Sequence, residues 1–240
     1  MAPRSAFLDK LLSEVRLNLE GPERKVLEQR MFRHLIGQGL PEDKTPIMTL
    51  SPRQKFFMDV FQGCSEIYSS FYRLRLAEAF VRKLLRSRSG NADELSYHVE
   101  KHLEEVYILK SRIISFLRFL QKRLRRRSFV ELTKKVSRWE VFVERAFGEI
   151  VKTRGSHVHV ERFGASDIKR LTTLDLLVLA GKMNELRKLR QVVLVSAVKE
   201  WGKAIKANNN TVENLLDRLF DDLTPIIFDK LAPQAEMEAR

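Results

Sequence analysis

Apolar residues recur at helical spacing along most of this 240-residue chain, and few residues interrupt them. Only 10 glycines and 7 prolines are present, and most fall between the periodic stretches. An apolar residue at every third or fourth position forms one stripe along a helix, which is buried against other helices. The only alternating, strand-like stretch is Val158 to Val160. The sequence therefore predicts an all-α bundle of long amphipathic helices.

Two long helices carry the clearest signals. One is predicted to begin after Ser51 and end between Ser87 and Gly90, and the next to begin after Asn91, because serine and asparagine favour the N-cap position. Each helix has one continuous apolar stripe, formed by Phe57, Val60, Cys64, Ile67, Phe71, Leu74, Val81 and Leu84 in the first, and by Leu95, Val99, Leu103, Val106, Ile113, Leu117, Leu120 and Leu124 in the second.

The remaining segments are predicted from weaker patterns. Before the two long helices, short helices are expected over residues 4–20 and 22–37, with a loop from Gly37 to Pro52. After them, helices are expected over 129–152, with Trp139, Phe142, Val143, Ala146 and Ile150 inward, then from the Ser166 cap to Ala207, and over 211–231. Asn208 to Asn210 is expected to separate the last two, and Pro225 to kink or divide the final helix.

These patterns suggest an N-terminal extension over residues 1–50, a bundle over 51–232 and a disordered tail over 233–240. Cys64 is the only cysteine, so an intramolecular disulfide framework is excluded and a reducing compartment is favoured. No apolar run approaches the ~20 residues of a membrane span, and the N-terminus does not resemble a signal peptide. A cytoplasmic protein without a membrane partner is expected.

Positive charge is concentrated in one part of the chain. The net charge is +13, and residues 51–130 carry 17 basic and 8 acidic side chains, or +9 of it. Such a concentration is typical of a protein that binds a polyanion, although a basic surface can also serve only solubility.

The strongest basic run is predicted to bind nucleic-acid phosphates. It consists of Arg118, Lys122, Arg123, Arg125, Arg126 and Arg127. The same run would also suit the C-terminus of a helix, where the dipole favours cations, or an acidic inhibitory protein partner. Phe129 and the tyrosines Tyr68, Tyr72, Tyr97 and Tyr107 could stack on bases, but aromatic residues at helical spacing are more often part of a core.

A second cluster of polar residues lies in the predicted break at Arg154 to Phe163. It contains Arg154, His157, His159 and Arg162, of which Arg162 is predicted to bind nucleic acid together with the basic run. Arginine binds phosphate through two parallel hydrogen bonds, and histidine exchanges protons near neutral pH, so the pair suits metal-independent RNA cleavage. If the break is extended, His157 and His159 point the same way. The alternative interpretation is an ordinary helix end in which Gly155 is a left-handed cap.

A helical bundle with Arg-x4-His at a helix boundary resembles the HEPN superfamily (higher-eukaryote and prokaryote nucleotide-binding domains). The stretch Asn91 to Arg127 is also similar to the long charged helix that precedes the motif in that family. The resemblance covers residues 52–207. It implies a metal-independent endoribonuclease, without a cofactor, that acts as a homodimer on RNA, in a toxin or antiviral-defence role.

The resemblance assigns catalytic roles to Arg154 and His159, with His157 beside them. Gly155 stands where the family often has a polar residue, so Ser156 or His157 would have to supply that contact. One histidine would take the 2′-hydroxyl proton, and an acid would protonate the 5′-oxygen, leaving 2′,3′-cyclic phosphate and 5′-hydroxyl ends. Arg154 would stabilise the charge that grows on the phosphoryl oxygens.

His98 and His102 lie one helical turn apart, a spacing that can bind zinc. Further ligands would have to come from Glu105 or His157, and a pair beside a helix stripe is the simpler interpretation, so no metal is expected. Three function classes remain open: a ribonuclease, a non-catalytic RNA- or nucleotide-binding module with the same basic surface, and a basic helical scaffold protein.

Overall fold

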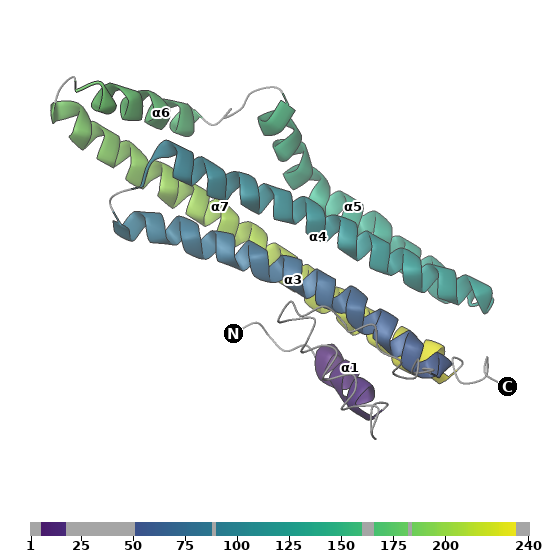
Figure 1. Ribbon diagram of the computed structural model, residues 1–240. Helices are drawn as coiled ribbons and strands as arrows, with labels where there is room; N and C mark the ends of the chain where they lie inside the picture. Colours follow the sequence, from purple (N-terminus) through teal and green to yellow (C-terminus); the bar gives the residue numbers. More distant parts are fainter. Residues whose placement is uncertain (1–5, 18–50, 88–89, 160–165, 182–183, 234–240) are drawn as a thin grey trace, which may run out of the picture. The chain divides into compact units, whose positions relative to one another are not determined.

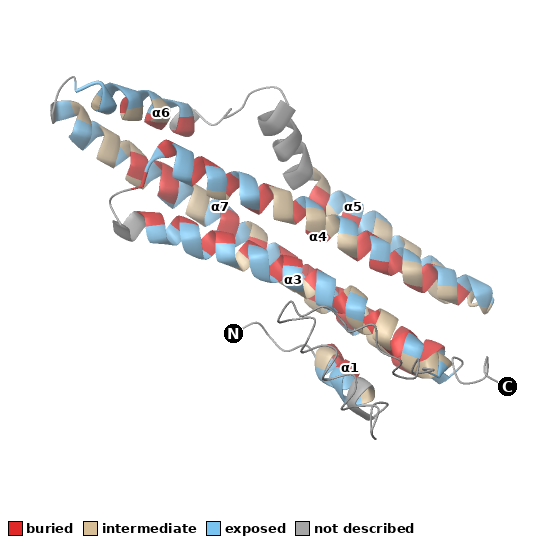
Figure 2. Cartoon of the chain, viewed as in Figure 1, coloured by how far each residue is buried: buried red, intermediate tan, exposed pale blue. Residues whose placement is uncertain are grey.

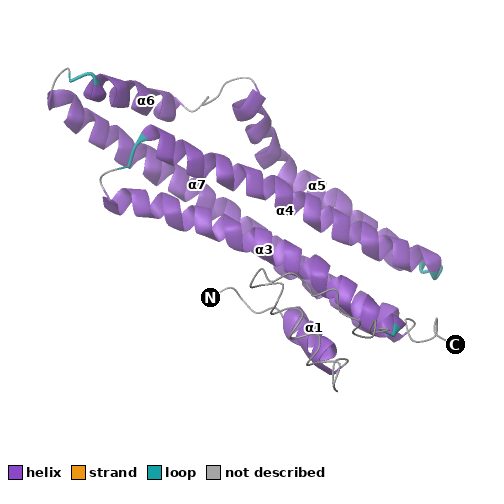
Figure 3. Cartoon of the chain, viewed as in Figure 1, coloured by secondary structure: helices purple, strands orange, loops and turns teal. Residues whose placement is uncertain are grey.

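The computed structural model describes residues 6–17, 51–87, 90–159, 166–181 and 184–233 (Figure 1). Every regular element in these ranges is helical, and no strand is present in them (Figure 3). The predicted all-α fold is therefore confirmed. The predicted helix over 22–37 and the predicted disordered tail, except its first residue, lie outside the described residues. No helix in the described ranges is both long enough and apolar enough to cross a membrane.

The chain forms two compact units. The first comprises residues 1–64 and 217–240 and contains α1 (Ala6–Leu17), the start of α3 (Pro52–Ser87), the end of α7 (Asn184–Pro225) and the π-helix η1 (Ile226–Leu231). Its core is aromatic. The ring of Phe7 stacks on Phe220 with centroids 4.7 Å apart and meets Phe228 edge-on at 5.7 Å.

The second unit comprises residues 65–216. It contains the rest of α3 and α7 together with α4 (Ala92–Arg126), α5 (Val130–His159) and α6 (Ser166–Leu179). One buried cluster joins four of these helices, with Val81 from α3, Leu95 from α4, Leu171 from α6 and Ala197 from α7 among its members. Helix α5 instead packs along α4 as an antiparallel hairpin (Figure 1).

Both predicted long stripes are confirmed as core residues. Each of the sixteen side chains in the α3 and α4 stripes is buried (Figure 2). Both predicted caps are also present: the Ser51 hydroxyl accepts the Gln54 N–H at 3.2 Å, and the Asn91 side chain accepts the Glu94 N–H at 2.8 Å. The Gln54 side chain accepts the Ser51 N–H in return, at 2.8 Å, which completes a capping box.

We expect Asn91→Ala to lower the free energy of unfolding by about 1 kcal/mol, because an N–H in the first turn of α4 loses its acceptor. Asn210→Ala is the matched control, since Asn210 is exposed in the interior of α7, where alanine has the better helix propensity. That control should be neutral or slightly stabilising. Urea unfolding of the two variants tests the difference, and equal effects would show that the cap is unimportant.

The predicted inward face of α5 was partly wrong. Phe142 is 49% exposed, whereas Val136, Val143 and Phe147 are buried. These three follow spacings of seven and four, the narrow stripe expected of a helix that packs against a single neighbour. The Phe142 ring meets Trp139 edge-on, with centroids 5.4 Å apart, instead of entering the core. Ile150 has no described side-chain environment.

The predicted helix from Ser166 to Ala207 is two helices. The chain turns after α6, where Gly181 has a φ of +70°, a conformation that residues with a side chain rarely adopt. The reversal lets α6 pack on the core, where Ile168 and Leu171 are buried, and it leaves Leu189 of α7 50% exposed. The core contacts of α6 require the chain to reverse here.

The predicted break at Asn208 to Asn210 is absent, because α7 continues through it. Asn209 is fully buried, and its amide donates to the Leu74 carbonyl at 3.3 Å and to the Glu78 carboxylate at 2.8 Å. These bonds to α3 outweigh the low helix propensity of asparagine. Pro225 does divide the final segment as predicted, since α-helix ends there and η1 begins.

Candidate nucleic-acid interface

The predicted basic run forms the last turn of α4 and the turn that follows. The Phe129 N–H donates to the Leu124 carbonyl at 3.1 Å, and the Ser128 N–H donates to the Arg125 carbonyl at 3.1 Å. This pattern is a Schellman cap, with Ser128 in the left-handed conformation at a φ of 57°. Helix α5 begins at Val130, so the arginines lie at the tip of a tight helical hairpin.

The hairpin is held together behind this tip by polar contacts between α4 and α5. Arg118 and Gln121 of α4 donate to the two oxygens of Glu140, at 2.7 Å and 2.9 Å. Burial alone would raise the pKa of Glu140, but these hydrogen bonds and the positive charge of Arg118 hold it below its usual value. Arg118, predicted to bind nucleic acid, therefore also has a structural partner.

The tip carries most of the net charge of the protein. We define the basic tip as the nine cationic side chains between residues 118 and 140. The same stretch contains only two carboxylates, so its net charge is +7 of the chain's +13. Its members are Arg118, Lys122, Arg123, Arg125, Arg126, Arg127, Lys134, Lys135 and Arg138. Within the described ranges, the exposed Lys122, Arg126 and Arg138 have no carboxylate in ion-pair contact. A polyanion can therefore reach them without displacing an internal partner.

Aromatic side chains accompany these cations. The Arg123 guanidinium lies over the Phe119 ring, 5.4 Å from its centroid, and Phe129 is half-buried in the hairpin turn. Farther along α5, the exposed Phe142 follows Arg138 by one helical turn. Alternation of cations with exposed rings is typical of surfaces that bind single-stranded nucleic acid. The predicted tyrosines Tyr72, Tyr97 and Tyr107 are exposed too, but none of them belongs to the tip.

The predicted break at Arg154 was wrong, because α5 remains helical through His159. His157 and His159 are therefore not in an extended segment, and Gly155 does not end the helix. The side-chain environments of Arg154, His157 and His159 lie outside what the structure describes, as does Arg162 altogether. The backbone of both motif residues is described: Arg154 and His159 lie on α5, about 7.5 Å apart along its axis.

The basic tip and the Arg-x4-His motif are not brought together within one chain. Val130, which follows the turn, and Arg154 are separated along α5 by about 36 Å of helix, and Arg138, the last cation of the tip, is about 24 Å from Arg154. A nucleic-acid strand advances about 3.4 Å per nucleotide, so roughly seven nucleotides would span from Arg138 to the motif and roughly ten from the turn. The helical backbone between them therefore keeps the two predicted clusters at separate positions on α5.

A buried polar layer, missed by sequence analysis, lies where α3, α4 and α7 meet. Glu78, His102 and Asn209 are all buried, and Arg82 forms an ion pair with Glu78. Neither ring nitrogen of His102 has a hydrogen-bond partner among the residues that the structure describes. Burial lowers the pKa of His102 to about 4, and the Glu78 charge only partly opposes this effect. The imidazole is therefore neutral at physiological pH.

His98 and His102, the pair whose spacing could suit zinc, lie in different environments. His98 lies at the edge of the bundle, where its ring stacks on Phe80 with centroids 5.1 Å apart, and burial lowers its pKa. His102 instead belongs to the buried layer. Among the residues that the structure describes, no three potential ligand side chains gather as a metal site requires.

Comparison with known proteins found no matching family model, no matching curated protein and no matching solved structure. Membership of the HEPN superfamily therefore stays a prediction from the motif. The basic tip is the site whose geometry the structure describes most completely.

Proposed function

We propose that this protein binds RNA, and that the basic tip of the α4–α5 hairpin contacts the phosphate backbone. The observation that carries the proposal is the net +7 at an exposed helical turn, where several cations have no carboxylate partner among the described residues. Phosphate contacts of this kind supply most of the affinity of non-specific nucleic-acid binding. The neighbouring Phe142 favours a single strand, because exposed rings stack on unpaired bases.

Replacing Arg123, Arg125, Arg126 and Arg127 with glutamine should weaken RNA binding several-fold or more. Each lost contact to single-stranded phosphate should also reduce the slope of log affinity against log salt by about 0.7. Fluorescence anisotropy with labelled single-stranded RNA over a range of salt concentrations measures both quantities. Single-stranded DNA and duplex RNA of equal length test whether the surface prefers RNA and unpaired bases.

The matched control removes the same charge from elsewhere in the second unit. Lys83, Lys199, Lys203 and Lys206 are exposed cations of α3 and α7. Their replacement by glutamine should change the affinity and the salt slope much less. Equal losses in the two quadruple variants would mean that RNA affinity depends only on net charge. The protein would then be better interpreted as a basic scaffold without an RNA site at the basic tip.

We further propose that bound RNA is cleaved at Arg154 and His159. The support is that both residues lie on one helix at a spacing similar to the HEPN motif, on the same helix that begins at the basic tip. The separation, about 24 Å from Arg138 of the tip and about 36 Å from the turn, gives this proposal a measurable consequence. RNA much shorter than roughly seven nucleotides should lose either tip affinity or cleavage, because one strand cannot occupy both places.

A homodimer belongs to the cleavage proposal, because one Arg–His pair lacks a second proton donor. The partner's His159 would protonate the leaving oxygen. The stripes of α3 and α4 do not provide the dimer interface, since they are buried within one chain. A toxin or antiviral-defence role would follow from unrestrained cleavage of cellular RNA.

A further inference from the structure

Exposed apolar side chains gather on α6 and the start of α7. Five of the fourteen large apolar side chains that are exposed within the described ranges fall in residues 176–192. They are Leu176, Leu177, Leu179, Leu189 and Val192, and we call them the α6–α7 apolar surface. Leu179 is 82% exposed, the highest value among these fourteen. Burying such a surface would contribute favourably to binding, so a concentration of this kind marks an interaction site.

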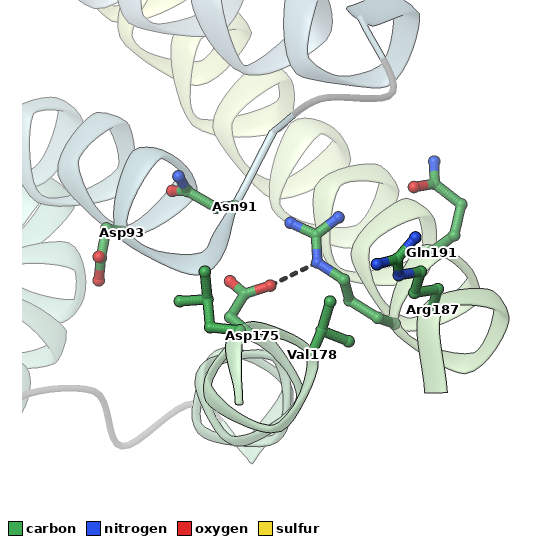
Figure 4. A pocket seen from close by; sticks show the side chains of 8 residues that line it. Asn91, Asp93, Asp175, Val178, Arg187 and Gln191 are labelled. Atoms are coloured by element: carbon green, nitrogen blue, oxygen red, sulfur yellow. Dashed lines mark hydrogen bonds and ion pairs between the residues drawn. The ribbon is translucent and has the colours of Figure 1, made fainter. Parts of the chain in front are cut away.

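A hollow of about 420 Å³ lies beside this surface. Figure 4 shows Asp175 and Val178 of α6 with Arg187 and Gln191 of α7 around it, and Asp93 of α4 and its N-cap residue Asn91 also line it. Hydrogen bonds and an ion pair hold the residues around the hollow in place. The Asp175 carboxylate accepts the Ala92 N–H at 2.8 Å and forms an ion pair with Arg190, whose guanidinium donates to the Gly90 carbonyl at 2.7 Å. Such a hollow can receive one large side chain of a partner.

The charges around the surface have one predominant sign. Among the described residues from 168 to 192, the exposed charged side chains are one carboxylate, Glu185, and four cations, Lys169, Arg170, Arg187 and Lys188. The exposed Asp93 of α4 adds a second carboxylate at the hollow, so the cations still predominate. Asp175 does not offset them, because Arg190 already neutralises it. Arg187 both lines the hollow and has no carboxylate partner among the described residues. A guanidinium so placed can hold a carboxylate of a partner through two hydrogen bonds.

We propose that the α6–α7 apolar surface docks an amphipathic helix of another protein, with an apolar face flanked by Glu or Asp. The apolar face would cover Leu176 and Leu179 and insert a side chain into the hollow, and its acidic flanks would meet Arg187 and Lys188. This use of the molecule is separate from RNA binding, because the basic tip lies at the opposite end of α4 from Asn91 and Asp93.

Charge and shape favour this occupant over two others. A second copy of this chain would bring the same four cations against each other, which costs binding energy. An anionic bilayer would satisfy the cations, but a flat lipid surface leaves the hollow unfilled. An acidic helix satisfies the apolar side chains, the hollow and the charges together.

The test uses a fluorescent, stapled peptide helix of about 18 residues with a leucine stripe flanked by glutamates. A second peptide has lysine at every glutamate position. The full-length protein should bind the acidic peptide with at least tenfold higher affinity at about physiological ionic strength. Leu176→Ser combined with Leu179→Ser should weaken this binding at least tenfold, and Arg187→Gln with Lys188→Gln several-fold.

The matched control is Val141→Ser with Phe142→Ser, which removes two comparably exposed apolar side chains from α5. Binding of the acidic peptide should not change in this variant. Hydrogen exchange should show peptide-dependent protection in residues 166–179 and 184–195. Circular dichroism melting confirms that the variants are folded.

Three results would overturn the proposal. The first is protection at residues 118–140 instead, since the peptide would then bind the basic tip through charge alone. The second is a dimer of the free protein that the leucine variant converts to a monomer, which would assign the surface to a second copy. The third is binding to phosphatidylserine vesicles that depends on the same leucines when the acidic peptide does not bind.

Discussion

We expect His159→Ala to cleave single-stranded RNA at least about 100-fold more slowly than the unchanged protein, because general acid–base catalysis by one positioned histidine contributes about this much. Arg154→Ala should cause a similar loss by removing the group that stabilises the developing phosphoryl charge. Binding at the basic tip should survive both changes, since even its last cation, Arg138, lies about 24 Å from Arg154 along α5. The measurement is the single-turnover rate with saturating protein.

His98→Ala is the matched control, because it removes an imidazole that stacks on Phe80 and lies outside the motif. His157→Ala should have a smaller effect than His159→Ala. Cleavage should persist in EDTA, leave 2′,3′-cyclic phosphate ends and depend on pH around ~6.5, the ordinary pKa of histidine. An intact rate in His159→Ala, or no cleavage by the purified protein, would leave the non-catalytic RNA-binding module as the function.

The second large effect concerns acid and the buried His102. Its pKa is about 4 in the folded protein, because burial disfavours the charged imidazole, and about 6.5 in the unfolded chain. Between these values the unfolded chain binds a proton that the folded protein does not. Stability is therefore unaffected by His102 above pH ~6.5, falls as the pH drops towards ~4, and falls no further below. The total loss should be about 3 kcal/mol.

Other groups also titrate in this range, so the comparison needs a variant that lacks only the imidazole. In His102→Leu, the loss of unfolding free energy between pH 7 and pH 4 should be smaller by about 3 kcal/mol. Glu78 keeps its ion pair with Arg82 and its hydrogen bond from Asn209 in that variant. His98→Leu is the control for a less buried imidazole. Identical pH dependence in the unchanged protein and His102→Leu would show that His102 does not control acid stability.

Prediction from sequence succeeded where a local pattern and burial agree. The stripes of α3 and α4 are long and lie on one face of each helix, so all sixteen positions that the periodicity named are buried. Ser51 and Asn91 were recognised as caps because the hydrogen bond of an N-cap involves only the next three residues. The basic run was placed at a helix end for the same reason, since its charges and its position are local properties.

Prediction failed where a partner distant in sequence decides the outcome. Phe142 and Phe147 both fit an inward face of α5, and only the contact with α4 buries Phe147 and leaves Phe142 half exposed. Asn209 is a poor helix former, yet its bonds to residues more than 130 positions earlier keep α7 continuous. The relation between the two predicted sites was also hidden, because a break was expected at Arg154 where the helix continues.

The sequence by itself determined the fold class, the two principal stripes, the helix caps and the location of excess charge. Each of these depends on helical periodicity, short-range hydrogen bonds or composition. Only the tertiary structure decided that the chain turns at Gly181 after α6 and that Glu78, His102 and Asn209 share a buried layer. It also decided that the basic tip and the Arg-x4-His motif lie apart along α5. These outcomes depend on which helices share a core, and burial against a distant segment outweighs the small local preferences of single residues.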